Sequence, residues 1–595
     1  MTAANPNARV ANRRRLWTSL MMAAPLTLLL VTLFLYPVGQ LLLLSFQDRQ
    51  GFSLSNYERL FASSVYVDVL LITLRISFFT ALLAVIAGYP IAYLISIIGK
   101  ERRTQLLFWV LLSFWTSFLV RGFAWVVLLG RNGVVNHLLT TLGITDAPVS
   151  LLYNFGSVLV GMVHAMMPLA ILTMLSVMDN IDRNLTRAAA TLGARPGTAF
   201  WKVYFPLSLP GVSAGAILVF VTAIGFFILP ALLGGRRETV ITQIIIEQVI
   251  QTLNWGFAGA VSVLLLLVVF VVFAIYNRLL GFSTMTGASA GSASAAPTPH
   301  KRGWSHRLGD AVLTALGTVS DMLIALMPRR RSRKREADAP PRALQFTVWG
   351  LLFLMSIPAF LMIPLSFGSG GLNWPPQGFT LRWYEQVFNS PIWTQAFTRS
   401  LTVGIGTGIL AMAVGTPVAF LLVRSNMRGK GLLMAFVLSP IVVPNIIIAV
   451  GLFYLYARLG LVGTSIGLIL GHTVITIPYV IITLTSVLRN YDIRLDLAAQ
   501  SLGANRVATL RHVTFPILGT GMLSSFLFAF AISFDELTIA LFSSGGLSAT
   551  LPKQFWDEVT MQVSPMIAAV STCLFLFIGG LIFIAELLRR RSATR

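Results

Sequence analysis

The chain has 595 residues, of which 56% are hydrophobic and only 11% are charged, and its mean hydropathy is +0.80. These values exclude an ordinary soluble globular domain and indicate a polytopic membrane protein. The net charge of +23 does not indicate a nucleic-acid binder, because the basic residues gather in short runs beside apolar segments.

Twelve apolar runs are long enough to cross a bilayer as helices, which takes about 20 residues each. The six runs of the first half are 17–46, 66–98, 105–130, 156–178, 207–233 and 257–281. The six runs of the second half are 345–367, 396–423, 432–457, 465–488, 516–543 and 565–588. We therefore expect an all-α integral membrane protein of two six-helix repeats, residues 1–281 and 343–595. Basic runs flank these repeats and predict that both termini are cytoplasmic, by the positive-inside rule.

Residues 282–342 form a linker that is first rich in Gly, Ala, Ser and Pro and then basic. Within it, apolar residues recur at helical spacing from Leu308 to Leu326, while Asp310 and Asp321 fall elsewhere on the wheel. A thirteenth span is the alternative, but two aspartates would be costly in hydrocarbon, and an extra span would invert the second half. We expect a cytoplasmic linker with an amphipathic helix that lies on the membrane surface.

A short motif between the fourth and fifth runs of each half occurs twice. In both copies an Ala-Ala pair is followed by Gly-Ala and, thirteen residues after the glycine, by a proline. The first copy comprises Arg187, Ala188, Ala189, Gly193, Ala194 and Pro206. The second comprises Leu497, Ala498, Ala499, Gly503, Ala504 and Pro516. Since both repeats have the same orientation, we expect a pseudo-twofold axis along the membrane normal.

Each copy of the motif predicts a knob on the cytoplasmic surface. A short helix that holds the Ala pair would end at Gly193 or Gly503, which can adopt the positive φ of a tight turn. A second helical piece would then lead into the membrane. An ordinary polar connection is the alternative, but a spacing of this length does not readily recur by chance.

This pattern resembles the permease motif of bacterial ATP-binding-cassette (ABC) importers, and the resemblance covers nearly the whole chain. The first half is similar to one permease subunit of the spermidine/putrescine importer family, in residues 114–116 with Arg121 and in residues 230–235. The second half is similar to the other subunit, in residues 533–535. The acidic residue of the family motif is replaced by Arg187 and by Leu497, with Asp496 one place early.

The resemblance implies the type I ABC importer permease fold. The residues of the two repeated motifs would couple the membrane spans to two cytoplasmic ATPase subunits. An extracytoplasmic solute-binding protein would deliver the substrate. ATP and Mg would be bound by the ATPases, so no cofactor is expected in this chain.

Two adjacent carboxylates, Asp535 and Glu536, fall within the eleventh run. A carboxylate at mid-bilayer costs at least about 2.5 kcal/mol, so the pair needs a role. One interpretation is a cation-attracting patch beside the pathway of a polyamine-like or amine-bearing substrate. The other is an ion pair with Arg75 or Arg121 of a neighbouring helix. The candidate substrate-pathway residues are Asp535, Glu536, Ser533, Trp115, Arg121 and Phe226.

The position of Phe226 bears on the substrate. In the first half, Gly225 and Phe226 match the two acids, and the resemblance places a glutamate of the family where Phe226 stands. The sequence therefore leaves open a substrate other than spermidine or putrescine. The alternatives are ferric iron and an opine or amino-acid derivative.

Other classes of function fit the sequence less well. The chain has no Gly-x-x-x-x-Gly-Lys-Ser/Thr motif, so we expect a transport subunit and not an ATPase. A gradient-driven secondary transporter would need more ionisable groups than the two acids, and a membrane scaffold would not explain them. Met162 and His164 could indicate a soft-metal site, but packing in the membrane interior explains these residues better. No metal site is therefore expected. We expect an importer of a small cationic solute in the bacterial cytoplasmic (inner) membrane that works by alternating access.

Overall fold

The computed structural model describes residues 19–48, 51–280, 304–326, 340–425, 427, 429–561 and 564–593, and they are mostly helical. The one sheet among them is an antiparallel ribbon of β1 (Gln47–Asp48) and β2 (Gly51–Phe52). The first span is Ser19–Leu44, which includes η1 (Val31–Leu35) and α2 (Tyr36–Leu44).

The remaining helices follow the two-repeat order. The first half continues with α3 (Ser55–Ala62), α4 (Ser64–Ile97), α5 (Lys100–Trp115), α6 (Phe118–Leu129), α7 (Val134–Thr141), α8 (Phe155–Met178), α9 (Asn184–Thr191), α10 (Pro196–Ala199), η2 (Phe200–Tyr204), α11 (Phe205–Ile224), α12 (Ile228–Leu233), η3 (Arg236–Glu238), α13 (Ile241–Ile250) and α14 (Trp255–Leu280). The linker contains α15 (Trp304–Leu326). The second half contains α16 (Arg342–Ser366), α17 (Arg382–Asn389), α18 (Pro391–Arg424), α19 (Lys430–Val442), α20 (Asn445–Leu459), α21 (Ser465–Arg489), α22 (Arg494–Ser501), α23 (Arg506–Thr509), η6 (Leu510–Thr514), α24 (Phe515–Phe534), α25 (Thr538–Ser543), η7 (Gly546–Ser548), α26 (Leu551–Met561) and α27 (Pro565–Ala593).

Ten helices among the described residues are long and apolar enough to cross a membrane. The bent pair α19 and α20 makes an eleventh if it counts as one span. The run expected at 565–588 coincides with α27, whose described apolar part, Pro565–Leu581, is shorter than a full span. The expected two-repeat helical architecture is confirmed, and each of the twelve expected runs coincides with a helix or a pair of helices among the described residues.

Four expected spans are bent or broken, in matched pairs. The run 105–130 divides into α5 and α6, and the run 432–457 divides into α19 and α20 at a 92° bend beside Pro444. Proline disfavours helical geometry in the residue before it, which explains this bend. The run 207–233 is interrupted at residues 225–227, and the run 516–543 at residues 535–537.

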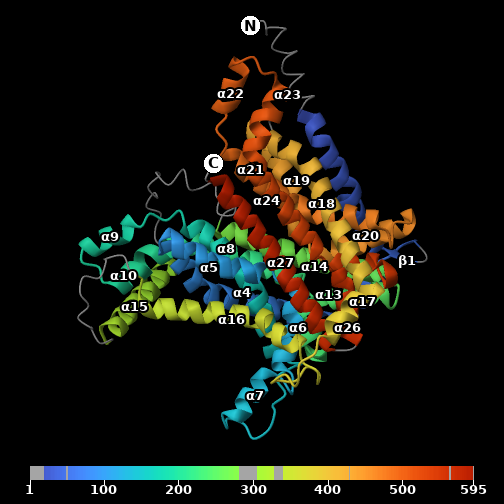
Figure 1. Ribbon diagram of the computed structural model, residues 1–595, viewed down its shortest axis with the longest axis horizontal. Coiled ribbons are helices and arrows are strands. Elements are labelled where there is room, and N and C mark those ends of the chain that lie inside the picture. Colours follow the sequence, from blue (N-terminus) through green and yellow to red (C-terminus); the bar gives the residue numbers. More distant parts are fainter. Residues whose placement is uncertain are drawn as a thin grey trace.

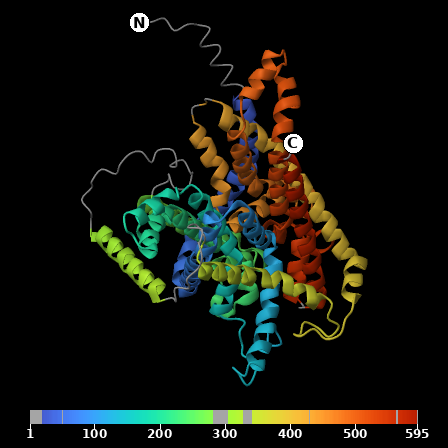
Figure 2. The same cartoon turned by 60° about the vertical axis from the view of Figure 1, so that its left-hand side comes forward.

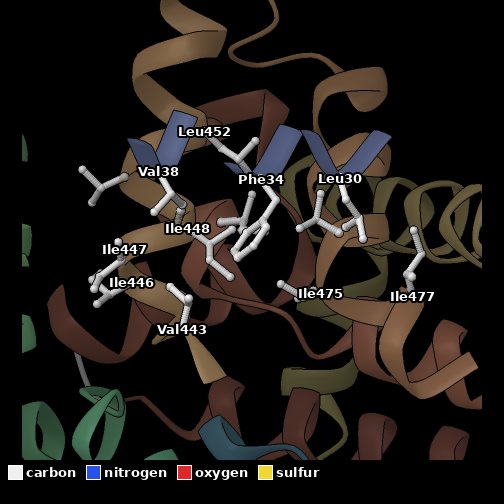
Figure 3. Packing of buried hydrophobic residues seen from close by; sticks show 14 of the residues in the cluster. Leu30, Phe34, Val38, Val443, Ile446, Ile447, Ile448, Leu452, Ile475 and Ile477 are labelled. Atoms are coloured by element: carbon white, nitrogen blue, oxygen red, sulfur yellow. The ribbon is translucent and has the colours of Figure 1, made fainter. Parts of the chain in front are cut away.

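The first helix of each half packs against the other half. α2 contacts α20, while α16 contacts α4, α5 and α6. Figure 3 shows Phe34 of the first span beside Ile448 of α20, both buried in one apolar cluster. Gly451 permits this approach, because a Cβ there would lie 2.9 Å from the carbonyl oxygen of Pro37. This exchange of first helices ties the two halves together.

The two halves diverge toward the ends that carry the repeated motifs. In Figure 1, α4, α8 and α16 run roughly across the view, whereas α18, α21 and α24 run roughly upright. The segment with α9 and α10 and the segment with α22 and α23 are well separated in both Figure 1 and Figure 2. The halves meet at the opposite side, where α6 contacts α26. The spans therefore form a V that opens toward the motifs.

Candidate functional site

Each copy of the repeated motif forms a helix, a tight turn and a second helix. α9 ends at Gly193, whose φ is +88°, and α22 ends at Gly503, whose φ is +91°. The Gly193 N–H donates to the Ala190 carbonyl, and the Ala194 N–H reaches back to Ala189. The same two bonds in the second copy join Gly503 to Gln500 and Ala504 to Ala499. Both turns are Schellman motifs, and the predicted positive φ at both glycines is confirmed.

The second arm of each knob is continuous with a membrane span. α10, η2 and α11 form one helix, Pro196–Ile224, and α23, η6 and α24 form another, Arg506–Phe534. In both, a π-helical turn lies just before the Phe-Pro pair that holds Pro206 or Pro516. The wider turn shifts the hydrogen-bond pattern next to a residue that cannot donate. The fixed spacing from glycine to proline thus sets the length of the arm from turn to span.

The tip of each knob exposes an apolar side chain. Leu192 is 88% exposed and Leu502 is 90% exposed, and they occupy matched positions. Leu497 and Arg187, at the acidic position of the motif, are exposed as well. A pair of large apolar side chains at matched tips is typical of a surface that a partner covers. Sequence reasoning chose the neighbouring alanines and missed these leucines, although Leu-Gly-Ala is repeated.

The second knob is fastened by Asp496, which is buried. Its Oδ1 accepts from the Tyr491 hydroxyl at 2.6 Å and from the Thr514 hydroxyl at 2.8 Å, and Arg424 Nη1 lies 2.7 Å from its Oδ2. Burial alone would raise the pKa of Asp496, but the Tyr491 and Thr514 hydrogen bonds and Arg424 hold it below its ordinary value of 3.8. This carboxylate therefore points into the protein and joins the knob to α18.

The first knob is fastened through other groups. Tyr204 and Ser96 share a hydrogen bond of 2.8 Å between their hydroxyl oxygens, and Arg183 donates to the Ser96 carbonyl. The linker helix α15 contacts both α10 and η2. The expected helix in the linker is thus present, while its position on a membrane surface stays a prediction. The two knobs have the same backbone conformation, but different side-chain contacts hold each of them to the rest of the protein.

At the centre of the molecule, the broken spans lie against the kinks of the opposite half. A Cβ added to Gly225, between α11 and α12, would lie 3.1 Å from Pro444 Cβ. The Asp535 carboxylate, between α24 and α25, accepts from the Phe118 N–H at 3.4 Å. The two contacts are pseudo-symmetric, and only one of them carries a charge.

Arg121 lies on α6, on the side of the Asp535 carboxylate, but the described contacts include no ion pair between the two. The guanidinium is buried, lies 4.5 Å from the centroid of the Phe118 ring, and donates from Nη1 to the Ala165 carbonyl oxygen at 3.0 Å. Arg75, the other candidate, lies over the Phe155 ring instead, at 4.5 Å. The expected ion pair with one of these two arginines therefore stays a prediction, and Arg121 is the better placed of the two.

Glu536 and Ser533 face the interior of the second half. The Glu536 carboxylate accepts from the N–H groups of Ile539 (3.0 and 2.9 Å) and Ala540 (3.3 Å), at the start of α25. Its Oε2 lies 3.4 Å from Nε2 of His472, and Nδ1 of His472 lies 2.8 Å from the Ser533 hydroxyl. The structure thus separates these two residues from Asp535. Sequence reasoning did not single out His472.

The aromatic candidates lie near the meeting point of the halves. The Phe226 and Phe118 ring centroids are 5.1 Å apart, and those of Trp115 and Phe528 are 5.0 Å apart. Trp115, Phe226 and Asp535 therefore each adjoin residues of the opposite half or of the central kink. Within the described part of the chain, no group of three or more His, Cys, Asp or Glu side chains is placed to hold a metal ion.

Comparison with known proteins gives two matches to one family model, described as "Binding-protein-dependent transport system inner membrane component", over residues 84–282 and 404–594. Each match includes one knob. The spermidine/putrescine transport system permease protein PotB of Haemophilus influenzae is 34% identical over 261 residues, 42% of this chain and 91% of PotB. PotC of the same organism is 32% identical over 255 residues, 42% of this chain and 96% of PotC.

Solved structures give a weaker likeness. A bacterial alginate ABC transporter in complex with an alginate pentasaccharide-bound periplasmic protein has a TM-score of 0.39 and 21% sequence identity. The match covers 45% of this chain and 96% of the other.

Proposed function

The chain belongs to the family of binding-protein-dependent transport system inner membrane components, and we propose that it is the fused, two-repeat permease of an ATP-driven importer. It is a multi-pass membrane protein whose relatives are permease subunits. Its two knobs are the coupling loops for two cytoplasmic ATPase subunits, which bind the ATP and Mg. An extracytoplasmic solute-binding protein delivers the solute, and both termini face the cytoplasm.

The observation that carries this proposal is the pair of matched knobs. Each has an exposed leucine at its tip, a rigid Schellman turn behind it and a second arm that continues without interruption into a span. A helix transmits displacement along its axis, because its backbone hydrogen bonds resist bending. Force applied to a knob by a nucleotide-dependent partner therefore reaches the centre of the membrane.

Alternating access is part of this proposal, and the divergence of the two halves supports it. The helices of the two halves diverge toward the knobs and meet at the opposite side (Figure 1). ATP-driven closure of the ATPases draws the knobs together and opens the outer side, and hydrolysis reverses the motion.

The solute is small and cationic in this proposal. Asp535 lies where the halves meet, and a substrate ammonium would compete with Arg121 for its carboxylate. The relatives PotB and PotC are named for spermidine and putrescine transport, which supports an amine-bearing substrate. Uptake measured with polyamines, opine-type amino-acid derivatives and ferric iron decides among the substrates.

The decisive experiment changes both turn glycines. In Gly193→Val/Gly503→Val, a β-branched residue at φ near +90° costs about 1–3 kcal/mol per site and distorts each turn. We expect a folded membrane protein whose ATP-driven uptake falls by about tenfold or more, while the co-purified ATPase continues to hydrolyse ATP.

The matched control is Gly143→Val/Gly460→Val. These glycines also have positive φ, +70° and +66°, with nothing within 4 Å of an added Cβ, but they lie outside the knobs. Uptake in this control should stay near the wild-type rate. Unchanged uptake in the knob variant, or uptake driven by an ion gradient without any ATPase, would contradict the proposal.

A further inference from the structure

The linker helix α15 packs on the first knob. It contacts α10 and η2, and both Figure 1 and Figure 2 place it beside α10 and away from the second knob. The contact centres on Asp321, which is only 6% exposed. Its Oδ1 accepts from the Gly197 N–H at 2.6 Å, and its Oδ2 accepts from the Thr198 N–H at 3.1 Å and the Thr198 hydroxyl at 2.6 Å.

Two glycines let the helices approach this closely. A Cβ added to Gly197 would lie 2.7 Å from Asp321 Oδ1 and 2.9 Å from the Asp321 backbone nitrogen. Facing it, a Cβ added to Gly317 would lie 3.4 Å from Thr198 Cα. The second knob has Val507 at the position of Gly197, and that side chain is 72% exposed. The surface that receives α15 therefore exists on the first knob alone.

Asp321 also replaces a cap that the first knob lacks. In the second knob, Asn505 Oδ1 accepts from the Ala508 N–H at 2.8 Å and so caps α23. The first knob has Arg195 at that position, and its side chain makes no such bond. Asp321 accepts a hydrogen bond from the N–H of Thr198, and Thr198 is the counterpart of Ala508. An acceptor from the linker thus takes the place of an acceptor from the knob itself.

The charge at this contact is favourable. Burial opposes ionisation of Asp321, but the hydrogen bonds from Thr198 and Gly197 and the nearby Arg195 hold its pKa below the ordinary 3.8. Asp321 is therefore a carboxylate at neutral pH, and the contact does not weaken across the physiological range.

We propose that α15 is a working part of the first coupling loop, in which Asp321 is a positioning residue that holds the second arm, and with it α11, in place. The functional part of this inference rests on the proposed role of the knobs in coupling. It adds that the two knobs are completed differently, the second by its own Asn505 and the first by the linker. The linker is then a mechanical component and not only a tether.

Hydrogen exchange on the full-length protein in lipid nanodiscs tests the contact without any ATPase. We expect Asp321→Ala to speed exchange of the Gly197 and Thr198 amides by about fivefold or more, since they lose their acceptor. Adding Arg195→Asn should restore protection at Thr198, because it recreates the cap that Asn505 provides. Met322→Gln, at a side chain of α15 that is 66% exposed, is the control. Unchanged exchange in Asp321→Ala would overturn the inference.

Disulfide trapping gives an independent test. In a Cys573→Ser background, Thr198→Cys and Gly317→Cys should cross-link on mild oxidation, because a Cβ at residue 317 would lie 3.4 Å from Thr198 Cα and 3.6 Å from Thr198 Oγ1. The matched pair Ala508→Cys and Gly317→Cys, directed at the second knob, should not. Equal cross-linking of the two pairs, or none in either, would show that α15 does not reside on the first knob.

Uptake per ATP hydrolysed tests the positioning role. We expect Asp321→Ala to lower this ratio by about fivefold and to lower the unfolding midpoint slightly, and Arg195→Asn to recover most of the ratio. If Gly193→Val/Gly503→Val leaves uptake intact, the proposed function itself fails. If that variant loses uptake while Asp321→Ala retains the wild-type ratio, only the role of α15 is refuted.

Discussion

At the scale of single residues, two adjacent carboxylates in one broken span have separate tasks. Glu536 satisfies the first amides of α25, which would otherwise be unpaired inside the membrane region. Asp535 turns to the other half and faces Phe118 and Arg121. Both residues lie in the break between α24 and α25, where the regular helical pattern of side-chain directions is interrupted.

Substitution separates the two tasks. Glu536→Ala removes the acceptor of buried N–H groups and should cost about 1–2 kcal/mol of stability, which lowers the midpoint of thermal unfolding. Glu536→Gln keeps one acceptor oxygen and should cost less. Asp535→Asn should leave the midpoint nearly unchanged but reduce uptake of a cationic substrate.

The opposite result identifies the alternative. If Glu536→Gln abolishes uptake at wild-type stability while Asp535→Asn transports normally, then Glu536 is the residue that faces the substrate. Asp535 would then have no part in the substrate pathway.

At the scale of helices, local chemistry could be predicted from the sequence and tertiary fit could not. Hydropathy located most of the spans, and the repeated glycine predicted each positive-φ turn, since both depend on residues near in sequence. The breaks at Gly225 and Asp535 escaped prediction because the composition is apolar on both sides. The docking of α15 escaped it because Gly197 and Asp321 are far apart in the chain.

The exchange of first helices depends on one glycine. Gly451→Ala places a Cβ 2.9 Å from the Pro37 carbonyl oxygen and 3.2 Å from the Val38 nitrogen, and these backbone atoms cannot move aside alone. We expect a loss of about 1–3 kcal/mol, measured as a lower unfolding midpoint of the full chain. The control is Gly431→Ala on α19, which meets nothing within 4 Å and should be neutral or slightly stabilising. Equal midpoints for the two variants would show that α2 and α20 are not closely packed.

At the scale of the whole molecule, each half combines a lever and an anchor. The lever is the knob with its continuous span, and the anchor is the first helix packed on the opposite half. In the proposed transport cycle, the halves would rotate about the region where they meet while the knobs travel furthest. The V in Figure 1 would then be one end of this movement.

The distance between the knobs should therefore report the transport cycle. Spin labels at Thr191 and Ser501, which are matched and exposed, can be placed in a Cys573→Ser background. When the co-purified ATPases are trapped with ATP and vanadate, the distance distribution should shorten by several ångströms, because their closure draws the levers together. Labels at Thr191 and Arg131, both in the first half, should keep their separation if each half rotates as a body. A constant distance from Thr191 to Ser501 during active ATP-driven uptake would mean that the knobs do not move, and that coupling reaches the membrane by another route.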